Sequence, residues 1–235
     1  MNILLLIRHA QASLLQDDYD TLSPLGEEQA DALGACWASS GLVCDRVYVG
    51  PRRRHRQTAE AVAAAYRARK LRWPDPVPLA ELDEYHGPIL VDRLLRQRIA
   101  DDPELASLRE GADAERMQRY FQTFKEISRQ WVGGELETPA DLEDWPSFRQ
   151  RIARVLEEMV PRTGDDQTAV AFTSGGTIAA AVGHVLGIAD GKVLELSWRV
   201  RNTASTELLF SEEQLLLNAF NTVSHLAEPR LVTYV

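Results

Sequence analysis

The sequence predicts an α/β fold, a three-layer α/β/α sandwich in which helices cover both faces of a mostly parallel sheet. Ile3–Ile7 and Ala169–Thr173 are uninterrupted apolar runs, which is typical of strands buried on both faces. Segments with helical spacing alternate with the strand candidates along the chain. With 235 residues, 45% of them hydrophobic, residues 1–235 are expected to form a single domain with a sizeable core.

The first half of the chain alternates strand and helix candidates. After Ile3–Ile7 a polar loop spans residues 11–22, and SPLGEEQADALGACW then predicts a helix. Ser23 is a suitable N-cap, and Pro24 suits the first helical position. DRVYV, residues 45–49, is the second strand candidate, and GPRRRHRQTAEAVAAAY predicts a loop that turns into an alanine-rich helix.

The second half begins with three prolines that break the chain before LAELDEYHG. Residues 91–131 then have the spacing of a helical region, and we interpret its apolar stripe as core packing. That stripe consists of Met117, Tyr120, Phe121, Phe124, Ile127 and Trp131. WPSFRQRIARVLEEM predicts another helix. In AVAFTSGGTIAAAVGHVLG we expect a strand, a turn at Ser174–Gly176 and a helix from Thr177, while STELLF and the terminal LVTYV are candidates for further strands.

Composition excludes several classes of function. The net charge of −9 argues against general nucleic-acid binding. Cys36 and Cys44 match no zinc pattern and are expected to be reduced thiols. The first apolar run is too short for a signal peptide, and no stretch approaches the about 20 apolar residues of a membrane span. We therefore expect a cytoplasmic protein that binds neither membrane nor nucleic acid.

Three polar segments follow directly after strand candidates. Arg8–His9, the cluster Arg52–Arg56 and Ser174–Gly176 should meet at one edge of the sheet, because ligands of such sheets bind at the carboxyl ends of strands. Guanidinium groups recognise phosphate through paired, charge-assisted hydrogen bonds. A loop such as SGGT offers backbone N–H groups to an anion at a helix N-terminus. The sequence therefore favours a phosphate site at this edge.

A histidine beside such a site has several potential roles. It can be a metal ligand, a general base, a nucleophile or a structural residue, but no two of the five histidines have a ligand pair's short helical spacing. As a nucleophile, a neutral imidazole at His9 would attack phosphorus while arginines spread the charge on the oxygens. The leaving group then needs a proton donor, for which Glu81 and Glu84 are candidates.

Taken in order, these segments resemble the histidine phosphatase superfamily, the phosphoglycerate-mutase-like proteins. LIRHAQAS is similar to that family's opening strand and Arg-His-Gly motif, and YDTLSPLGEEQADALG to the segment after it. VYVGPRRRHRQTAEA resembles the family's Ser-x-x-x-Arg-Ala-x-Gln-Thr-Ala stretch, and LDEYHG its Leu-x-Glu segment. AVAFTSGGTIAA stands where the family has a strand, His-Gly-Gly and a helix, and RNTASTELLF and NAFNTVSHL resemble its closing strands. The resemblance spans nearly the whole chain.

The resemblance implies roles for individual residues. His9 would be the phosphorylated nucleophile, Arg8 and Arg54 would bind phosphoryl oxygens, and Glu84 would be the acid, with Glu81 as the weaker alternative. Ser174 and Gly175 would complete the phosphate-binding residues. The family uses no metal, and we expect no cofactor. Residues of about 91–135 would form a helical insertion that covers the site and selects the substrate.

The chain departs from the family pattern in two places, at Ala10, where the family has glycine, and at Ser174, where it has a second histidine. A serine hydroxyl carries no positive charge, so its presence could slow the reaction by about two to three decades. The resemblance thus implies a metal-independent phosphomonoesterase acting on a small phosphorylated metabolite or phosphoprotein. A phospho-ligand-binding protein without turnover is the alternative, and a mutase is less favoured.

The remaining histidines and the assembly are left open. His55 and His86 could line the pocket, although we expect both to be solvated, and His184 and His225 receive no role. The oligomeric state is not predicted, with a homodimer as one option.

Overall fold

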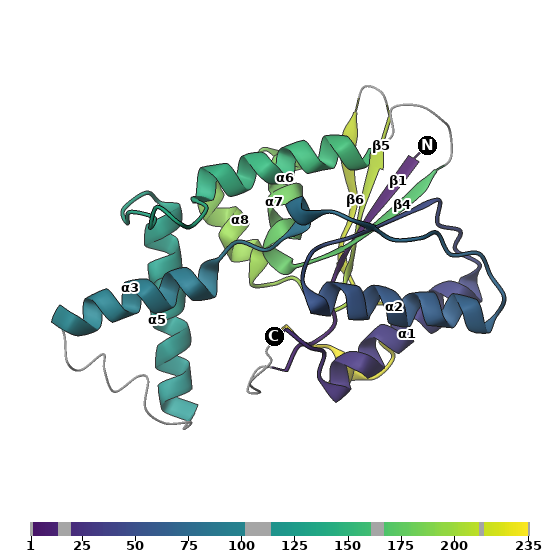
Figure 1. The fold of residues 1–235 in the computed structure, drawn as a ribbon, viewed down its shortest axis with the longest axis horizontal. Coiled ribbons are helices and arrows are strands. Elements are labelled where there is room, and N and C mark those ends of the chain that lie inside the picture. The colour runs from purple at the N-terminus through teal and green to yellow at the C-terminus, as the bar shows by residue number, and fades with distance from the viewer. Residues whose placement is uncertain (1, 14–19, 102–113, 161–166, 212–213, 235) are drawn as a thin grey trace.

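The computed structural model describes residues 2–13, 20–101, 114–160, 167–211 and 214–234 (Figure 1). Its strands are β1 (Asn2–Arg8), β2 (Arg46–Val49), β3 (Val77–Pro78), β4 (Thr168–Thr173), β5 (Ser205–Phe210) and β6 (Leu215–Thr222). Its helices are α1 (Pro24–Ser40), α2 (Arg53–Ala68), α3 (Gly87–Asp101), α5 (Ala114–Val132), α6 (Trp145–Met159), α7 (Gly175–Leu186) and α8 (Asp190–Ser197), with short 3₁₀ turns at Ala80–Leu82 and Pro229–Leu231.

The strands form one six-stranded sheet in the order β3-β2-β4-β1-β5-β6. β1 pairs parallel with β4, β2 pairs parallel with both β4 and β3, and only β5 and β6 are antiparallel to their neighbours. Arg8 lies opposite Thr173, and Val49 lies opposite Phe172. The carboxyl ends of β1, β2 and β4 therefore meet at one edge, as the sequence predicts.

Helices cover both faces of the sheet, which confirms the predicted α/β class. Successive side chains of a strand point to opposite faces. Leu4 and Leu6 of β1 accordingly pack in a core with residues of α6, α7 and α8, whereas Leu5 and Ile7 pack in a second core with residues of α1 and α2. In Figure 1, α1 and α2 lie side by side on one side of the sheet, and α6, α7 and α8 lie on the other.

The predicted first residue is confirmed for α1 and differs by two positions for α7. Ser23 is the N-cap of α1 and accepts a hydrogen bond from the Gly26 N–H at 3.0 Å, and Pro24 is the first helical residue. Helix α7 begins at Gly175, two residues before the predicted start at Thr177.

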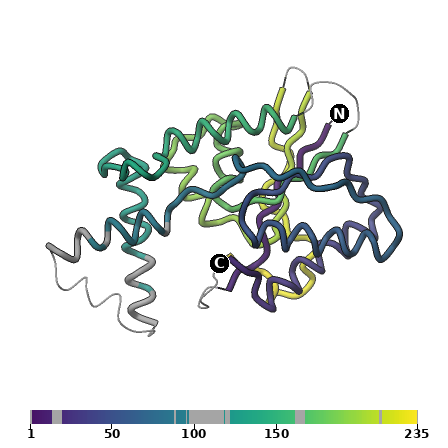
Figure 2. The backbone as a smooth tube through the Cα atoms, in the orientation of Figure 1, coloured from purple at the N-terminus to yellow at the C-terminus, as the bar shows by residue number. Residues whose placement is uncertain are grey.

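The helical region expected over residues 91–131 is present as α3 and α5, which lie together at the end of the molecule away from α1 and α2 (Figures 1 and 2). Ile127 and Trp131 are buried and Phe124 is partly buried against the same core, which confirms that part of the predicted stripe. Met117, Tyr120 and Phe121 have side chains outside the described residues.

One strand candidate is wrong. The last strand is β6, within the segment NAFNTVSHL and the leucines before it, and the described residues of LVTYV form no strand. Their backbone groups bond to other elements instead, because Gln29 Nε2 donates to the Leu231 carbonyl and the Asn202 N–H donates to the Thr233 carbonyl. Figure 2 shows this terminal segment beside the end of β1. Within the described part of the chain, none of the helices combines the length and apolarity that crossing a membrane requires.

Candidate active site

His9 follows β1 directly and is only 5% exposed at the carboxyl edge of the sheet. Its Nδ1 lies 2.7 Å from the Ala10 carbonyl oxygen, and its Nε2 lies 3.1 Å from Arg54 Nε. Because a carbonyl oxygen only accepts and a guanidinium N–H only donates, Nδ1 carries the ring proton and Nε2 presents its lone pair. Burial, followed by the charges of Arg54 and Arg8, holds the pKa of His9 well below its usual range. The imidazole is therefore neutral at neutral pH.

Hydrogen bonds to distant segments fix the backbone around His9. The His9 N–H donates to the Thr173 carbonyl at 2.8 Å, and Asn202 Nδ2 donates to the His9 carbonyl at 3.1 Å. The Ala10 N–H donates to Thr58 Oγ1 at 3.0 Å. Ala10 does not have a positive φ, so alanine replaces glycine here without backbone strain. The imidazole is thus held from β4, α2 and the loop before β5.

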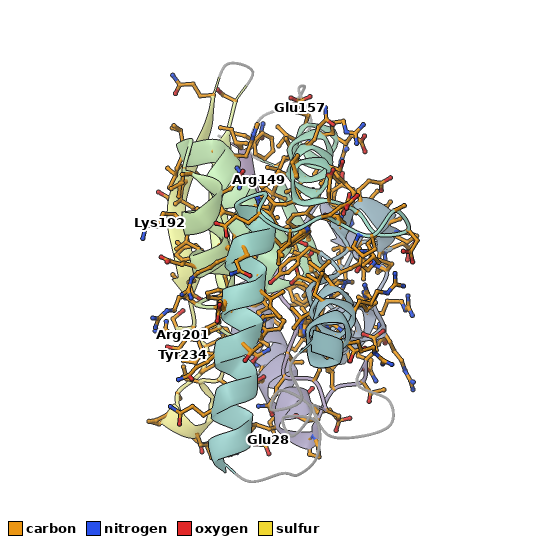
Figure 3. The ribbon with its side chains drawn as sticks, turned by 90° about the vertical axis from the view of Figure 1, so that its left-hand side faces the viewer. Glu28, Arg149, Glu157, Lys192, Arg201 and Tyr234 are labelled. Atoms are coloured by element: carbon orange, nitrogen blue, oxygen red, sulfur yellow. The ribbon has the colours of Figure 1, made fainter. Side chains whose placement is uncertain are left out.

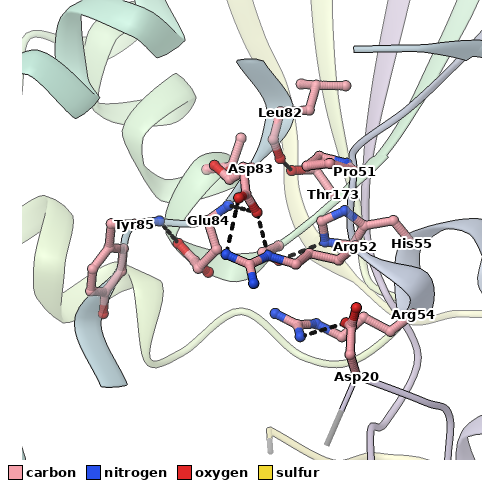
Figure 4. A network of polar contacts seen from close by, with 12 residues as sticks. Asp20, Pro51, Arg52, Arg54, His55, Leu82, Asp83, Glu84, Tyr85 and Thr173 are labelled. Atoms are coloured by element: carbon pink, nitrogen blue, oxygen red, sulfur yellow. Dashed lines mark hydrogen bonds and ion pairs between the residues drawn. The ribbon is translucent and has the colours of Figure 1, made fainter. Parts of the chain in front are cut away.

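Arg54 lies in the first turn of α2 and joins His9 to a carboxylate. Its Nε donates to His9 Nε2, and its Nη1 donates to Asp20 Oδ1 at 2.9 Å. Asp20 Oδ2 accepts the Arg53 backbone N–H at 2.7 Å and so caps a helix whose own N-cap residue, Arg52, makes no side-chain cap bond. The arginine is therefore oriented at both ends of its guanidinium, and Figure 4 shows the end that contacts Asp20.

Arg8 approaches from the other side, beside the terminal segment. Its Nη1 donates to the Val200 carbonyl and, at 2.6 Å, to the Tyr234 carbonyl. A Cβ atom at Gly175 would lie 3.6 Å from Arg8 Nε, which places the guanidinium against the start of α7. Arg8 also lowers the pKa of His9, as a nearby cation does.

The other arginines of the cluster do not converge on His9. Arg52 forms a two-pronged ion pair with Asp83, with Nε–Oδ1 and Nη2–Oδ2 distances of 2.5 and 3.0 Å (Figure 4). The side chains of Arg53 and Arg56 are exposed. Of the Arg52–Arg56 cluster, only Arg54 is therefore in contact with the His9 imidazole, as expected. Arg52 instead binds Asp83, the residue before Glu84.

Glu84 reaches the same edge from the segment after β3. Its Oε2 accepts the Gly176 N–H at 2.9 Å, and its Oε1 accepts the Tyr85 N–H at 3.0 Å. Burial raises the pKa of Glu84 above its ordinary value, although these two hydrogen bonds and the charges of Arg54 and Arg8 act in the opposite direction. A Cβ at Gly176 would lie 2.0 Å from Glu84 Oε1, so only glycine lets the carboxylate approach α7 this closely.

Glu81 lies three residues before Glu84 and differs from it in its surroundings. Its side chain is exposed, at a 3₁₀ turn. The segment between them is tied to β4 and α7, because Thr173 Oγ1 donates to the Leu82 carbonyl and Thr177 Oγ1 donates to the Asp83 carbonyl. The geometry therefore favours Glu84 over Glu81.

Ser174 lies at the junction of β4 and α7 and is fully buried beside a second imidazole. Its Oγ lies 2.7 Å from Nε2 of His55, whose side chain is 0% exposed. The rings of His55 and His9 lie 5.6 Å apart between centroids. The expectation that His55 is solvated is therefore wrong: it belongs to the site. His86 is half-buried, His184 is exposed, and His225 Nε2 lies 2.9 Å from Thr203 Oγ1.

An imidazole, two guanidinium groups, a half-buried carboxylate and a helix N-terminus thus share one sheet edge. The model of the histidine phosphatase superfamily (branch 1) matches residues 4–104 and 88–223. The chain belongs to the histidine phosphatase superfamily. This membership indicates a phosphatase-type function and hence a hydrolase.

Solved structures of other histidine phosphatases share the fold. A phosphoserine phosphatase mutant from Entamoeba histolytica, in complex with phosphoserine, is 19% identical with a TM-score of 0.65, covering 96% of this chain and 100% of that one. Mycobacterial glucosyl-3-phosphoglycerate phosphatase with inorganic phosphate is 21% identical with a TM-score of 0.62, covering 97% and 100%. A putative α-ribazole-5′-P phosphatase from Escherichia coli is 17% identical with a TM-score of 0.62, covering 95% and 98%. No curated protein matches the chain.

The structure brings the predicted site residues together, and it adds residues that the sequence did not point to. His9, Arg8, Arg54, Glu84 and the Ser174–Gly175 turn all lie at the predicted edge. The missed residues, which hold those groups in place, are Asp20, His55, Thr58 and Asn202. One signal for His55 was present, because it lies four residues before Ala59 and seven before Val62, on the buried face of α2.

Proposed function

We propose that this histidine phosphatase is a metal-independent phosphomonoesterase that acts through a phosphohistidine at His9. The observation that carries the proposal is the pair of contacts that the two ring nitrogens of His9 make. Its Nδ1–H is donated to the Ala10 carbonyl, so that Nε2 has a lone pair directed at the Arg54 guanidinium. A phosphoryl group entering between them would meet the nucleophile and a cation together.

In the first step, Nε2 of His9 attacks phosphorus, a P–N bond forms, and the bond from phosphorus to the leaving oxygen breaks. The guanidinium of Arg54 transfers its contacts from His9 and Asp20 to phosphoryl oxygens, and Arg8 supplies further positive charge. Backbone N–H groups at Ser174–Gly175 face an anion at the N-terminal end of α7. These groups stabilise the charge on phosphorus as it is transferred.

Glu84 supplies the proton that the leaving oxygen needs. The raised pKa of Glu84 favours the protonated carboxyl, which is the form required of a general acid. In the second step, the carboxylate accepts a proton from water as the water oxygen attacks phosphorus. The P–N bond then breaks, and inorganic phosphate leaves with His9 and Glu84 restored.

Helices α3 and α5 support the proposal that residues of about 91–135 select the substrate. Tyr85, next to Glu84, stacks on Trp131 of α5 with ring centroids 5.9 Å apart, and it meets Trp145 and Phe148 of α6 edge-on. The segment that contains Glu84 and Tyr85 therefore packs in one aromatic cluster with α5 and α6. A substrate whose phosphate lies at His9 would extend toward these helices, which suits a small phosphorylated metabolite or a phosphoprotein.

A second candidate is a phospho-ligand-binding protein without turnover. Ser174 favours it, because no charged side chain stands at that position. A mutase is less favoured. It needs cations for two phosphoryl positions, whereas Arg52 is paired with Asp83 and the side chains of Arg53 and Arg56 are exposed.

Phosphate release from a panel of phosphorylated metabolites tests the proposal. The panel would include phosphoserine, glucosyl-3-phosphoglycerate and α-ribazole phosphate, the compounds named for the similar phosphatases. We expect release with chelator present that disappears in His9→Ala and persists in His184→Ala, a matched control on an exposed imidazole. Binding of a panel compound without release by the wild type would favour the binding protein.

A further inference from the structure

His55 is a buried imidazole at the site that the two steps above do not use. Its ring centroid lies 5.6 Å from that of His9, and its Nε2 lies 2.7 Å from Ser174 Oγ. The neighbouring residue of α2, Arg54, binds His9, and the residue before Ser174, Thr173, accepts the His9 N–H. The pair of His55 and Ser174 is therefore built into the same two elements that hold the nucleophile.

The backbone next to each residue allows the contact between the His55 and Ser174 side chains. A Cβ at Gly50, which follows β2, would lie 2.4 Å from His55 Nδ1, so glycine makes room for the ring. Ser174 is the N-cap residue of α7, a position where serine usually bonds the backbone of the first turn. Its side chain makes no such bond and instead meets His55.

We assign the ring proton of His55 to Nε2, the nitrogen that faces Ser174. Burial first, and then the charges of Arg54 and Arg52, hold the pKa of His55 well below its usual range, so the ring is neutral. The Gly50 backbone beside Nδ1 acts against this lowering of the pKa of His55, but it makes no hydrogen bond of good geometry with Nδ1, which has no other partner among the described residues. An unpaired buried acceptor is tolerated better than an unpaired buried N–H. Nε2–H is thus the donor, and Ser174 Oγ accepts.

We propose that His55 is a positioning residue that orients the Ser174 hydroxyl to donate its own hydrogen to a phosphoryl oxygen. A serine Oγ that accepts one hydrogen bond still has one O–H to give. Fixed by the buried ring, that O–H becomes a preorganised donor at the start of α7, where the charge on the phosphoryl group develops. This inference rests on the proposed function, because it assigns a role in the same phosphoryl transfer.

Steady-state kinetics on five variants test the proposal. We expect His55→Ala and Ser174→Ala each to lower kcat by about 10- to 100-fold, with KM changed by less than about threefold. The double variant should be no slower than the slower single variant, since the two residues act as one unit. His55→Gln keeps an amide N–H near the position of Nε2 and should recover most of the lost rate, and His184→Ala should match the wild type.

Affinity for orthovanadate, measured by calorimetry, gives a second reading that needs no turnover and no natural substrate. We expect His55→Ala and Ser174→Ala to weaken vanadate binding equally, and thermal melts identify any variant that fails to fold. A wild-type rate in folded His55→Ala, or additive losses in the double variant, would overturn the inference and leave the proposed function standing. A wild type that neither releases phosphate nor binds vanadate would overturn both.

Discussion

Replacing Glu84 with glutamine separates proton donation from every other role of that carboxyl. General acid catalysis contributes about 10²- to 10⁴-fold, which is about 3–5 kcal/mol of the barrier. An alkyl phosphate needs that proton because its leaving oxygen is strongly basic. A p-nitrophenyl group leaves readily as the anion and needs it far less. We therefore expect Glu84→Gln to lose about 10²- to 10⁴-fold in kcat on an alkyl phosphate and about tenfold or less on p-nitrophenyl phosphate.

The comparison of two substrates removes the structural effect of the substitution. Glutamine keeps an oxygen for the Gly176 N–H or the Tyr85 N–H, but its amide turns a donor toward the other one. That mismatch costs about 1–3 kcal/mol of stability, which a thermal melt measures. Any loss of geometry affects both substrates alike, so the ratio of their rates reports proton donation.

Glu81→Gln provides the matched control, because Glu81 is exposed on the same segment. It should leave both rates within about twofold of the wild type. Equal losses on both substrates in Glu84→Gln would refute the assignment of Glu84 as the acid. A leaving-group-dependent loss in Glu81→Gln would move that role to Glu81.

Further predictions concern a cation and a buried imidazole. Arg54→Lys should lower kcat by at least about 10²-fold, because the single ammonium nitrogen of lysine lacks the planar fork of N–H donors that binds two phosphoryl oxygens at once. Arg53→Lys, on an exposed side chain, should keep the wild-type rate. Burial lowers the pKa of His225 to about 4, so the unfolded chain binds a proton below about pH 6.5 that the folded chain does not. The wild type should therefore lose about 2 kcal/mol more unfolding free energy between pH 8 and pH 5 than His225→Gln in urea titrations; parallel curves would contradict this.

Local physics made the sheet and the first helix predictable from the sequence. The apolar run Ile3–Ile7 fits a strand buried on both faces, and it lies in the middle of the sheet between β4 and β5. Ser23 and Pro24 mark the start of α1 because capping depends on neighbouring backbone groups alone. The terminal LVTYV has the composition of a strand, but its partners are Gln29 and Asn202, which no local pattern reveals.

Site residues that directly follow a strand could be predicted from the sequence. Hydrogen-bond partners that come from distant parts of the chain could not. Arg8 and His9 follow β1 directly, so the edge of the sheet could be inferred. The partner of Arg54 is Asp20, 34 positions away, and that of Ser174 is His55, 119 positions away. His55 stands in a run of arginines that suggests a solvated surface, but the helical phase of α2 turns it inward.

The buried surroundings of Ser174 complicate any test that restores the family's second histidine at this position. Ser174→His alone would add a second ring where the His55 ring already lies, 2.7 Å from the serine oxygen, and would test overpacking rather than charge. Combining it with His55→Ala exchanges the two sites and keeps one imidazole in the space. The terminal segment also contacts the site, because the Tyr234 carbonyl accepts a hydrogen bond from Arg8. Arg201 lies over the ring of the same tyrosine, 5.6 Å from its centroid (Figure 3).

Trapping the phosphoenzyme tests the central claim most directly. The wild type would be mixed with the best substrate of the panel, quenched in alkali, which preserves phosphohistidine, and digested for mass spectrometry. The account predicts one phosphoryl group on the peptide that contains His9, lost on brief exposure to acid and absent from His9→Ala. A phosphoryl group on Ser174, or phosphate release at the wild-type rate by His9→Ala, would contradict it.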